Sequence, residues 1–311
     1  MKFDKLMVVF NNKYITNINT DKFNSTYEGK QLRMLNYMQK SPFMLRIRID
    51  KLKQETSIEF TGKVLGRNYP VLISSETIRE CFENIQHLSI CQLDIDGILA
   101  TAEVPKLDVT KDVETDFEEC VVNLEFAIVN NRRWQVEKYQ GSHGRVVRKN
   151  VSSVECKRRL VIYNKEREMM RDENSEFLKY VGRQMLSHFK GITRFELNLT
   201  NKKQIRKLLC IEDNRLLSVL ASSANPILSV VNEAFDFSKT PAKSETIASW
   251  QKTCVLEKYN YDLAEIERNI RALASNNTSI KKLMAPYHQL VTSRKLQHTD
   301  GFDLRPLLAE M

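Results

Sequence analysis

The stretch Ile192-Thr-Arg-Phe-Glu-Leu-Asn-Leu199 alternates apolar and polar residues without a break. An alternation of period two is typical of a β-strand with one buried face. The buried face would carry Phe195, Leu197 and Leu199, and the other face Arg194, Glu196 and Asn198. This stretch therefore predicts a half-buried sheet with polar side chains gathered on its second face.

Segments around this stretch extend the pattern. Strand-like alternation or short β-rich runs occur at residues 43–49, 57–64, 88–93, 104–112, 134–139, 145–148 and 158–164. Helical spacing of apolar residues occurs at 74–85, 117–128 and 175–188, and it dominates after residue 209, where Asp262 is a candidate helix cap. No internal repeat is visible, and residues 236–243 are the best candidate for a linker. We therefore expect an α+β fold, with an antiparallel-sheet domain over residues 1–235 and a smaller helical domain over residues 236–311.

The positive charge of the chain is concentrated in one segment. The 311 residues contain 48 Lys and Arg against 39 Asp and Glu, a formal net charge of +9. Residues 131–167 alone hold 11 Lys and Arg against three Glu, while the remaining 274 residues hold 37 basic and 36 acidic side chains. A local excess of positive charge favours contact with phosphates.

Several classes of protein are excluded or disfavoured by what the sequence lacks. No apolar run approaches the roughly 20 residues needed to cross a bilayer, and Leu6 to Phe10 is too short for the core of a signal peptide. The six cysteines never form a Cys-x-x-Cys pair. There is no phosphate-binding loop and no Gly-x-Gly-x-x-Gly turn. We expect a soluble, cytoplasmic protein of bacterial type without a membrane partner.

A few polar residues on separate predicted strands could carry chemistry. Asp108, Tyr163 and Glu196 each project from a different strand, with Glu168 close behind the tyrosine. Carboxylates from separate elements suit a hard divalent cation such as Mg²⁺ or Mn²⁺. A tyrosine hydroxyl beside such a cation could attack phosphorus. Taken one at a time, the same residues are ordinary packing or solvated residues of a sheet, and the basic segment an ordinary solvated hairpin.

The order of these residues resembles a known family. Lys106-Leu-Asp108-Val-Thr, then Leu160-Val-Ile-Tyr163-Asn-Lys165-x-x-Glu168, then Arg194-Phe-Glu196 is similar to the gene II/X replication initiators of filamentous phages. The tyrosine motif is also similar to that of rolling-circle initiators of small staphylococcal-type plasmids. The similarity covers roughly residues 43–209. The family often has Arg two residues before the aspartate, where this chain has Lys106, which cannot make the planar bidentate contact.

The resemblance implies an antiparallel-sheet nickase domain that cuts and rejoins DNA. It implies Tyr163 as nucleophile, Lys165 and Arg194 as stabilisers of the phosphate, and Asp108, Glu168 and Glu196 as metal-binding or acid/base carboxylates for Mg²⁺ or Mn²⁺. The expected partners are origin DNA, single-stranded or extruded as a hairpin, and a host helicase and polymerase, and self-association into a homodimer is left open. From the basic segment we expect DNA contacts by Arg132, Arg133, Trp134, Lys138, Arg145, Arg148, Lys149, Arg158 and Arg159.

Other functions remain open at this point. The His-hydrophobe-His pair of histidine-type nucleases is absent, and no His-x-x-Arg motif of tyrosine recombinases precedes a late tyrosine. A DNA-binding replication or transcription regulator without catalytic activity would use the same basic hairpins. A structural scaffold is a third class, and a steep fall of DNA affinity with salt would argue against it.

Overall fold

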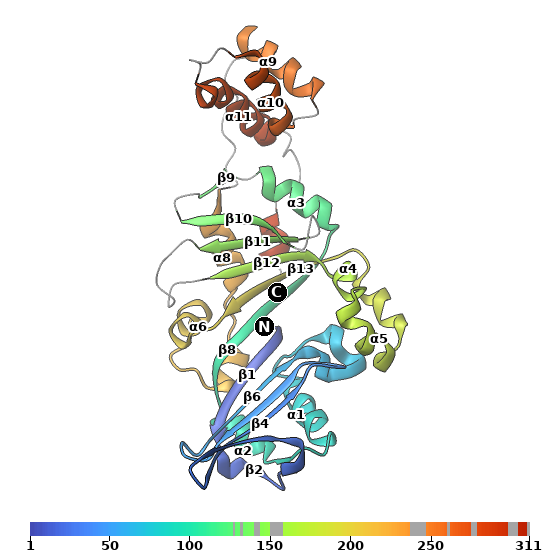
Figure 1. Cartoon of the computed structure of the whole chain (residues 1–311), viewed down its shortest axis with the longest axis vertical. Helices are drawn as coiled ribbons and strands as arrows, with labels where there is room; N and C mark the ends of the chain where they lie inside the picture. Colours follow the sequence, from blue (N-terminus) through green and yellow to red (C-terminus); the bar gives the residue numbers. More distant parts are fainter. Residues whose placement is uncertain are drawn as a thin grey trace. The chain divides into compact units, whose positions relative to one another are not determined.

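A ten-stranded antiparallel sheet dominates the structure (Figure 1). The computed structural model describes residues 1–126, 128–130, 133–139, 144–149, 158–236, 247–259, 262–274, 279–297 and 304–309. The strand order is β10-β11-β12-β13-β8-β1-β6-β5-β4-β3. Their bounds are β1 Phe3–Asn11, β3 Asn24–Glu28, β4 Gln31–Gln39, β5 Leu45–Asp50, β6 Glu55–Thr61, β8 Glu103–Glu114, β10 Trp134–Tyr139, β11 Gly144–Lys149, β12 Arg159–Asn164 and β13 Ile192–Leu199.

The sheet consists of two halves with the same topology. In the first half, β1 lies beside β6, and β5, β4 and β3 follow outward; in the second, β8 lies beside β13, and β12, β11 and β10 follow outward. Two small strand pairs lie outside this sheet, β2 (Ile15–Thr16) with β7 (Gln92–Leu93), and β9 (Ile128–Val129) with β14 (Phe235–Asp236). Because β1 and β8 are antiparallel neighbours, the halves are related by an approximate half-turn. The two halves therefore share one strand order although no repeat is visible in the sequence.

Helices bury one face of each half. In the first half α1 (Ile78–His87) lies behind β6, where the rings of Phe60 and Phe82 are 5.8 Å apart. In the second half α8 (Pro226–Ala234) contacts β8 and β13, and Leu197 and Val230 are fully buried. The alternating burial of β1, β6 and β13 follows from this one-sided cover. Further helices are α2 (Ile95–Thr101), α6 (Lys202–Leu209), α7 (Leu216–Ala221) and α12 (Leu304–Ala309). Two short 3₁₀ helices, η1 (Asn12–Tyr14) and η2 (Thr20–Lys22), lie near the N-terminus in the sequence.

A helical insertion covers part of the other face, in the second half alone. Between β12 and β13 the chain forms α4 (Lys165–Met169), η5 (Asp172–Asn174), α5 (Ser175–Val181) and η6 (Arg183–Phe189). These pack against η3 (Gly62–Val71) in a small core that contains Tyr69, Met169, Phe177 and Phe189. The prediction of one helix over residues 175–188 is wrong, because Gly182 at φ +97° ends α5 and the chain continues as a 3₁₀ helix.

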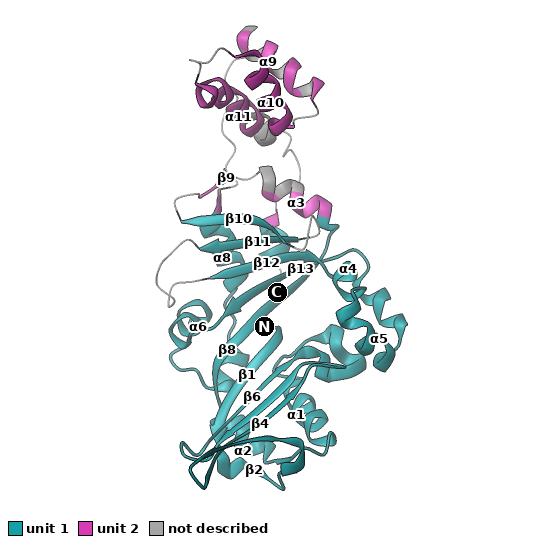
Figure 2. Cartoon of the chain, in the orientation of Figure 1, with its two compact units in different colours: residues 1–117, 131–234, 305–311 teal, residues 118–130, 235–304 magenta. Residues whose placement is uncertain are grey.

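The chain divides into two compact units (Figure 2). The first comprises residues 1–117, 131–234 and 305–311, and the second residues 118–130 and 235–304. The helices of the second are α9 (Ile247–Lys258), α10 (Leu263–Leu273) and α11 (Ile280–Gln297), and most of α3 (Phe117–Phe126) also belongs to it. Leu256, Ile266, Met284 and Val291 form its core. Asp262 caps α10 by accepting bonds from the backbone N–H groups of Ala264 and Glu265, as the sequence predicts.

The mixed α and β composition and the large antiparallel sheet agree with the predicted fold class. β8 continues to Glu114, two residues beyond the predicted end of that strand. β12 ends at Asn164, as predicted, and the Asn164 side chain caps α4, so Lys165 is the first residue of a helix. Most of the predicted linker, residues 237–243, lies outside the described residues. Within the described part of the chain, no helix has the length and apolar character needed to cross a bilayer.

Candidate functional site

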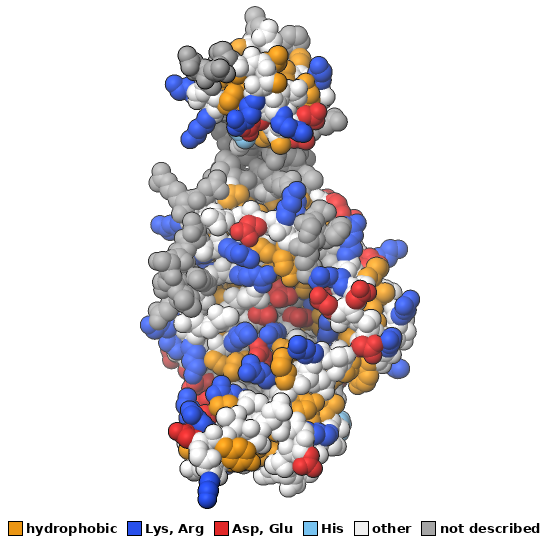
Figure 3. Space-filling view, in the orientation of Figure 1, with side chains coloured by type: hydrophobic (Ala, Val, Ile, Leu, Met, Phe, Trp, Pro, Cys, Tyr) orange, Lys and Arg blue, Asp and Glu red, His pale blue; other side chains and the backbone are white. Residues whose placement is uncertain are grey.

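The candidate catalytic residues lie on the face of the second half that α8 does not cover. Strand register places Asp108 opposite Asn198, and Tyr163 opposite Arg194. Directly opposed residues project to the same side of a sheet. β8, β13 and β12 therefore present Asp108, Glu196 and Tyr163 together, as predicted. Figure 3 shows acidic side chains gathered at the centre of this face, with basic side chains on both sides of them.

Tyr163 is nearly buried and bonded to a carboxylate. Its side chain is 7% exposed and packs against Val146 and Val161. The phenol Oη donates a hydrogen bond to Glu196 Oε2 at 2.9 Å. Burial, with the nearby charge of Glu196, raises the pKa of Tyr163 well above 10. The hydroxyl is therefore protonated in the resting site, and its proton points at Glu196.

Glu196 is a carboxylate whose charge is poorly compensated. Burial, followed by the neighbouring charges of Asp4 and Asp108, raises its pKa to about 7. Burial also raises the pKa of Asp108, against the opposing effect of a hydrogen bond from Asn198. A carboxylate with a pKa of about 7 takes up and releases a proton near neutral pH, which is the property a general acid or base needs.

An asparagine fixes the orientation of Glu196. Asn198 Nδ2 donates to Glu196 Oε1 at 3.3 Å, and its Oδ1 accepts from Arg159 Nη1 at 2.8 Å. These two bonds leave Glu196 Oε2 facing Tyr163. Arg159, predicted to contact DNA, thus also supports the carboxylate through Asn198. It lies 5.4 Å from the centre of the Tyr139 ring on the same face.

Lys165 and Glu168 form a buried ion pair beside Tyr163. Lys165 is 1% exposed, and its Nζ lies 2.6 Å from Glu168 Oε2 and 5.7 Å from the centre of the Tyr163 ring. Burial alone would raise the pKa of Glu168, but Lys165 and Lys63 outweigh it and bring the pKa to about 2. Asn174 donates further bonds to Glu168. Glu168 is therefore a fully ionised partner of cations, unlike Glu196.

Arg194 is the centre of a second buried cluster. It is fully buried and donates two parallel bonds to Asp112, at 2.6 and 2.7 Å. Its Nη1 also donates to Asp4 Oδ1 at 2.8 Å and to the Tyr69 hydroxyl at 3.0 Å. Burial would raise the pKa of Asp4, but Arg194, Lys165 and Lys63 lower it overall. Arg194 is predicted to stabilise the phosphate, and this geometry leaves it no direct contact with one, since its guanidinium is enclosed and already bonded.

The predicted metal ligands do not form one cluster. Among the described residues, no three His, Cys, Asp or Glu side chains are placed to hold a metal ion. Glu168 is occupied by Lys165 and Asn174. Asp108 and Glu196 fit a hard cation better, because both are buried carboxylates to which no cationic side chain of the described residues is hydrogen-bonded. Mg²⁺ in proteins is commonly held by one or two carboxylates, with water and phosphate oxygens completing its shell.

The predicted DNA-binding residues divide between the two faces of the sheet. Because side chains alternate along a strand, Arg148 and Arg159 lie on the face of Tyr163, whereas Lys138, Arg145 and Lys149 lie on the α8 side. Lys149 and Arg158 each bond Glu233 of α8 at 2.5 Å. Arg133 is exposed, Arg148 pairs with Glu137 at 3.3 Å, and Arg132 lies outside the described residues.

Trp134 corrects another prediction. Its side chain is completely buried, with Lys149 5.6 Å from the ring centre. An enclosed indole has no free face on which an unpaired base could stack. The tryptophan that follows the basic residues is a core residue of the α8 side, because position 134 lies opposite Lys149 in the β10–β11 pair.

Sequence reasoning missed Asp4, Tyr69, Asp112 and Asn198 as members of the site. Asp4 stands on β1, a strand that the sequence analysis did not assign, and Tyr69 comes from a 3₁₀ segment far from any motif. For Asp112 a signal was present, since it continues the alternation of Asp108 and Thr110 along β8. Asn198 was placed on the polar face without a role.

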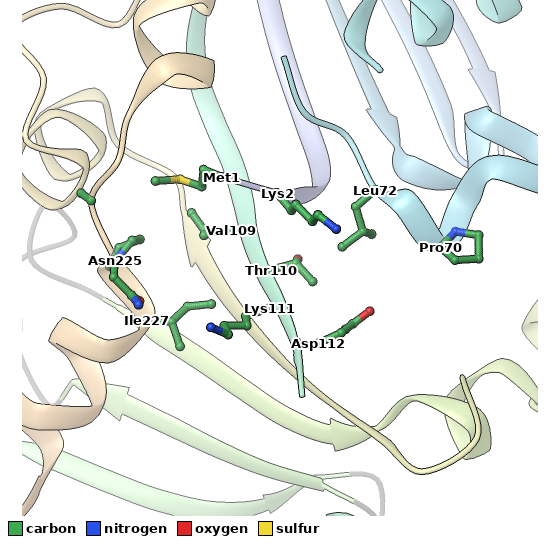
Figure 4. Close-up of a pocket in the computed structure, with 12 residues that line it drawn as sticks. Met1, Lys2, Pro70, Leu72, Val109, Thr110, Lys111, Asp112, Asn225 and Ile227 are labelled. Atoms are coloured by element: carbon green, nitrogen blue, oxygen red, sulfur yellow. The ribbon is translucent and has the colours of Figure 1, made fainter. Parts of the chain in front are cut away.

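A cavity lies next to this site and not in it. A cavity of about 320 Å³ forms where β8 continues past the start of β1 (Figure 4). Figure 4 shows Val109 and Lys111 on the side of Ile227, and Asp112 on the side of Pro70. Neither Asp108, Tyr163 nor Glu196 lines it. The candidate catalytic residues are therefore separate from this cavity, on the face of the sheet that α8 does not cover.

Comparison of the chain with family models, with curated proteins and with solved structures finds no match.

Proposed function

We propose that this protein is a rolling-circle replication initiator that nicks and rejoins DNA by transesterification at Tyr163. The observation that carries the proposal is the 2.9 Å hydrogen bond from Tyr163 Oη to Glu196. A nucleophile joined to a base, with the base oriented by a third group, is the usual arrangement of nucleophilic catalysis. Asn198 is that third group here. The resemblance of the motifs to gene II/X initiators supports the same reaction.

The proposed reaction exchanges one phosphodiester for another. Tyr163 Oη attacks the scissile phosphorus, its proton passes to Glu196, and the bond from phosphorus to the 3′ oxygen breaks. The departing 3′ oxygen takes up a proton, giving a free 3′-OH and a 5′-phosphotyrosyl link. Joining is the reverse reaction with an incoming 3′-OH, so no nucleotide cofactor is consumed. A pKa near 7 suits Glu196 to both directions.

The cations of the site have different roles in this proposal. The ammonium of Lys165 lies close enough to the Tyr163 ring to favour negative charge on the phenol oxygen. Arg194 acts as a positioning residue, since it ties Asp4, Asp112 and Tyr69 together behind the acidic pair. Asp108 and Glu196 would hold Mg²⁺ or Mn²⁺. When bound, the metal would offset charge on the scissile phosphate.

The proposed substrate is origin DNA, single-stranded or extruded as a hairpin, in the cytoplasm of a bacterial host. Arg133, Arg148 and Arg159 are the members of the basic segment best placed to contact its phosphates. A host helicase and polymerase would then extend the 3′-OH. A homodimer is compatible with these roles, and none of them requires it.

A second candidate is a DNA-binding regulator of replication or transcription without catalytic activity. The low exposure of Tyr163 favours it, because a tyrosine packed against Val146 and Val161 and bonded to a glutamate can be purely structural. The two candidates differ in one covalent step.

Formation of a protein–DNA adduct separates them. The full chain is incubated with Mn²⁺ and end-labelled single-stranded oligonucleotides that tile the candidate origin, and is then run on a denaturing gel. We expect a shifted band that Tyr163→Phe abolishes and that Tyr139→Phe, a tyrosine on the same face, retains. Circular dichroism of both variants checks that they fold. An adduct that survives in Tyr163→Phe, or no adduct on any oligonucleotide, refutes the proposal.

A further inference from the structure

The first half of the sheet has an open face that continues the candidate site. Register pairs Lys106 with Met7, Met7 with Glu59 and Glu59 with Arg46, so these four residues form one row across β8, β1, β6 and β5. Asp108 lies two residues along β8 from Lys106, and Lys5 lies opposite it. Arg48 occupies the next row, opposite Ser57. The open face is therefore the side of the sheet that carries Asp108.

The side chains of this face are accessible. Arg46 and Arg48 are exposed, Lys106 and Met7 are partly exposed, and Met38, at the end of the same row on β4, is 59% exposed. Figure 3 shows basic and hydrophobic side chains interspersed on the surface below the acidic centre. The fully buried apolar residues of β5 and β6 point the other way, toward α1.

The open face has an excess of cations. Glu59 is its central acid, and Lys5 and Lys106 both contact it at 2.7 Å. Burial would raise the pKa of Glu59, but the two lysines outweigh it and keep the carboxylate ionised. Arg46 and Arg48 have no ion-pair partner among the described residues. Asp50, opposite Glu55, and Asp108 also belong to this face, but both are buried. Among its accessible side chains, Lys5, Lys106, Arg46 and Arg48 face Glu55 and Glu59, so the accessible surface attracts anions.

The side chains of the open face favour duplex DNA over single-stranded DNA as the bound partner. Proteins that hold single strands place aromatic side chains beside their basic residues, so that bases stack. The described rows through Arg46 and Arg48 contain methionine, serine and asparagine but no aromatic residue. Duplex DNA shows phosphates at its surface and keeps its bases paired. From β8 to β5 the distance is about 14 Å, three strand spacings, so a duplex that begins at the candidate site can reach the arginines.

We propose that the open face of β1, β5 and β6, with Arg46 and Arg48 as its main contacts, binds the phosphates of duplex DNA that flanks the nick site. This inference rests on the proposed function for the position of the nick. The face itself requires only a DNA partner.

Binding to duplex DNA tests the face separately from catalysis. Fluorescence anisotropy is measured between 50 and 300 mM salt with labelled duplex and single-stranded DNA of equal length, all variants carrying Tyr163→Phe so that nothing is cut. We expect Arg46→Gln with Arg48→Gln to weaken duplex binding roughly tenfold at low salt and to lower the log–log salt slope by about 2. The control is Arg33→Gln with Arg79→Gln, which removes the same charge from exposed positions on the other face of β4 and on α1.

Each outcome decides the proposal. Loss of duplex binding in Arg46→Gln with Arg48→Gln, with the control unchanged, supports it. Unchanged binding, an equal loss in the control, or a loss restricted to single strands overturns it. A change of oligomeric state by light scattering, with binding unchanged, overturns it in favour of a contact between copies of the chain. The adduct assay is read separately: no adduct with wild type, together with loss of duplex binding, refutes the nicking function and leaves the DNA-binding face standing.

Discussion

The two halves of the sheet share one topology, but helices cover the same face to different extents in the two halves. In the first half, residues 51–54 form a short turn between β5 and β6, and the face beyond them stays open. In the second half, residues 165–191 replace that turn with α4, α5 and two 3₁₀ helices. The open face carries exposed Arg46 and Arg48, whereas the covered end carries fully buried Arg194.

This difference shows where chemistry can develop on a duplicated scaffold. On the open face, the Lys5–Glu59 pair is partly exposed, at 23% and 13% of the two side chains, and the two lysines keep the pKa of Glu59 below its usual value. Under the insertion the same side-chain types are desolvated, so their pKa values diverge: Glu196 rises to about 7 and Glu168 falls to about 2. A helical insertion beside one sheet edge therefore supplies the desolvation that acid–base chemistry needs.

The largest expected effect is on the buried arginine. Arg194→Met leaves Asp4 and Asp112 near a low-dielectric core without their shared cation, and we expect a loss of about 3–5 kcal/mol in the free energy of unfolding. Arg48→Met, the same change on the open face, should shift it by less than about 0.5 kcal/mol. Urea denaturation followed by circular dichroism measures both.

The double variant Asp112→Asn with Arg194→Met tests the cause. It removes one stranded carboxylate, so it should recover part of the loss. If Arg194→Met costs no more than Arg48→Met, the insertion does not bury the cluster as described, and the contrast between the halves is wrong.

Much of the fold of the second half could be predicted from its sequence. The strands at residues 134–139, 145–148 and 192–199 were predicted nearly residue for residue, because each alternates clearly. The strands of the first half were harder to predict from the sequence. β1 sits at the centre of the sheet, but its run from Leu6 to Phe10 is uniformly apolar, and β3 is exposed along its whole length. Neither pattern has a period-two signal.

The sequence predicted which residues belong to the candidate site better than it predicted the contacts between them. Alternation placed Asp108, Tyr163 and Glu196 on one face, and the structure brings them together. It could not show that Glu168 would pair with Lys165, since that contact depends on where β12 ends and α4 begins. Nor could it show Asp4 beside Arg194, which are 190 residues apart in sequence. Contacts of that kind come from topology and not from local pattern.

The next effect concerns the two glutamates of the covered end, measured in metal-free buffer. The folded-state pKa of Glu196 is raised to about 7, so the folded state loses stability as pH rises from about 4.5 to about 7. Glu196→Gln should therefore stabilise the fold above pH 7 by up to about 3 kcal/mol and have little effect near pH 4.5. Thermal unfolding at pH 4.5, 6 and 8 measures this.

Glu168→Gln should give the opposite result. Its pKa is lowered to about 2, so its contribution is complete above about pH 4.5 and is lost as pH falls toward 2. At pH 7 we expect a loss of about 3 kcal/mol. Glu59→Gln on the open face is the control and should change stability by less than about 1 kcal/mol. Equal signs for Glu168→Gln and Glu196→Gln would contradict the assignment of different environments.

The smallest expected effect is on the backbone of the insertion. Gly182 links α5 to η6 at φ +97° and ψ +142°, a region that side-chain-bearing residues rarely adopt, and an added Cβ would also meet the Gln184 side chain. Gly182→Ala should cost about 1–3 kcal/mol and reduce the yield of the DNA adduct, because η6 supplies Phe189 beside Lys165 and Arg194. Gly29→Ala, at φ +61° with open space around it in the β3–β4 turn, should cost about 1 kcal/mol and leave the adduct yield unchanged. If both variants lower the adduct yield equally, the insertion has no special part in shaping the site, and the chemistry must depend on the sheet alone.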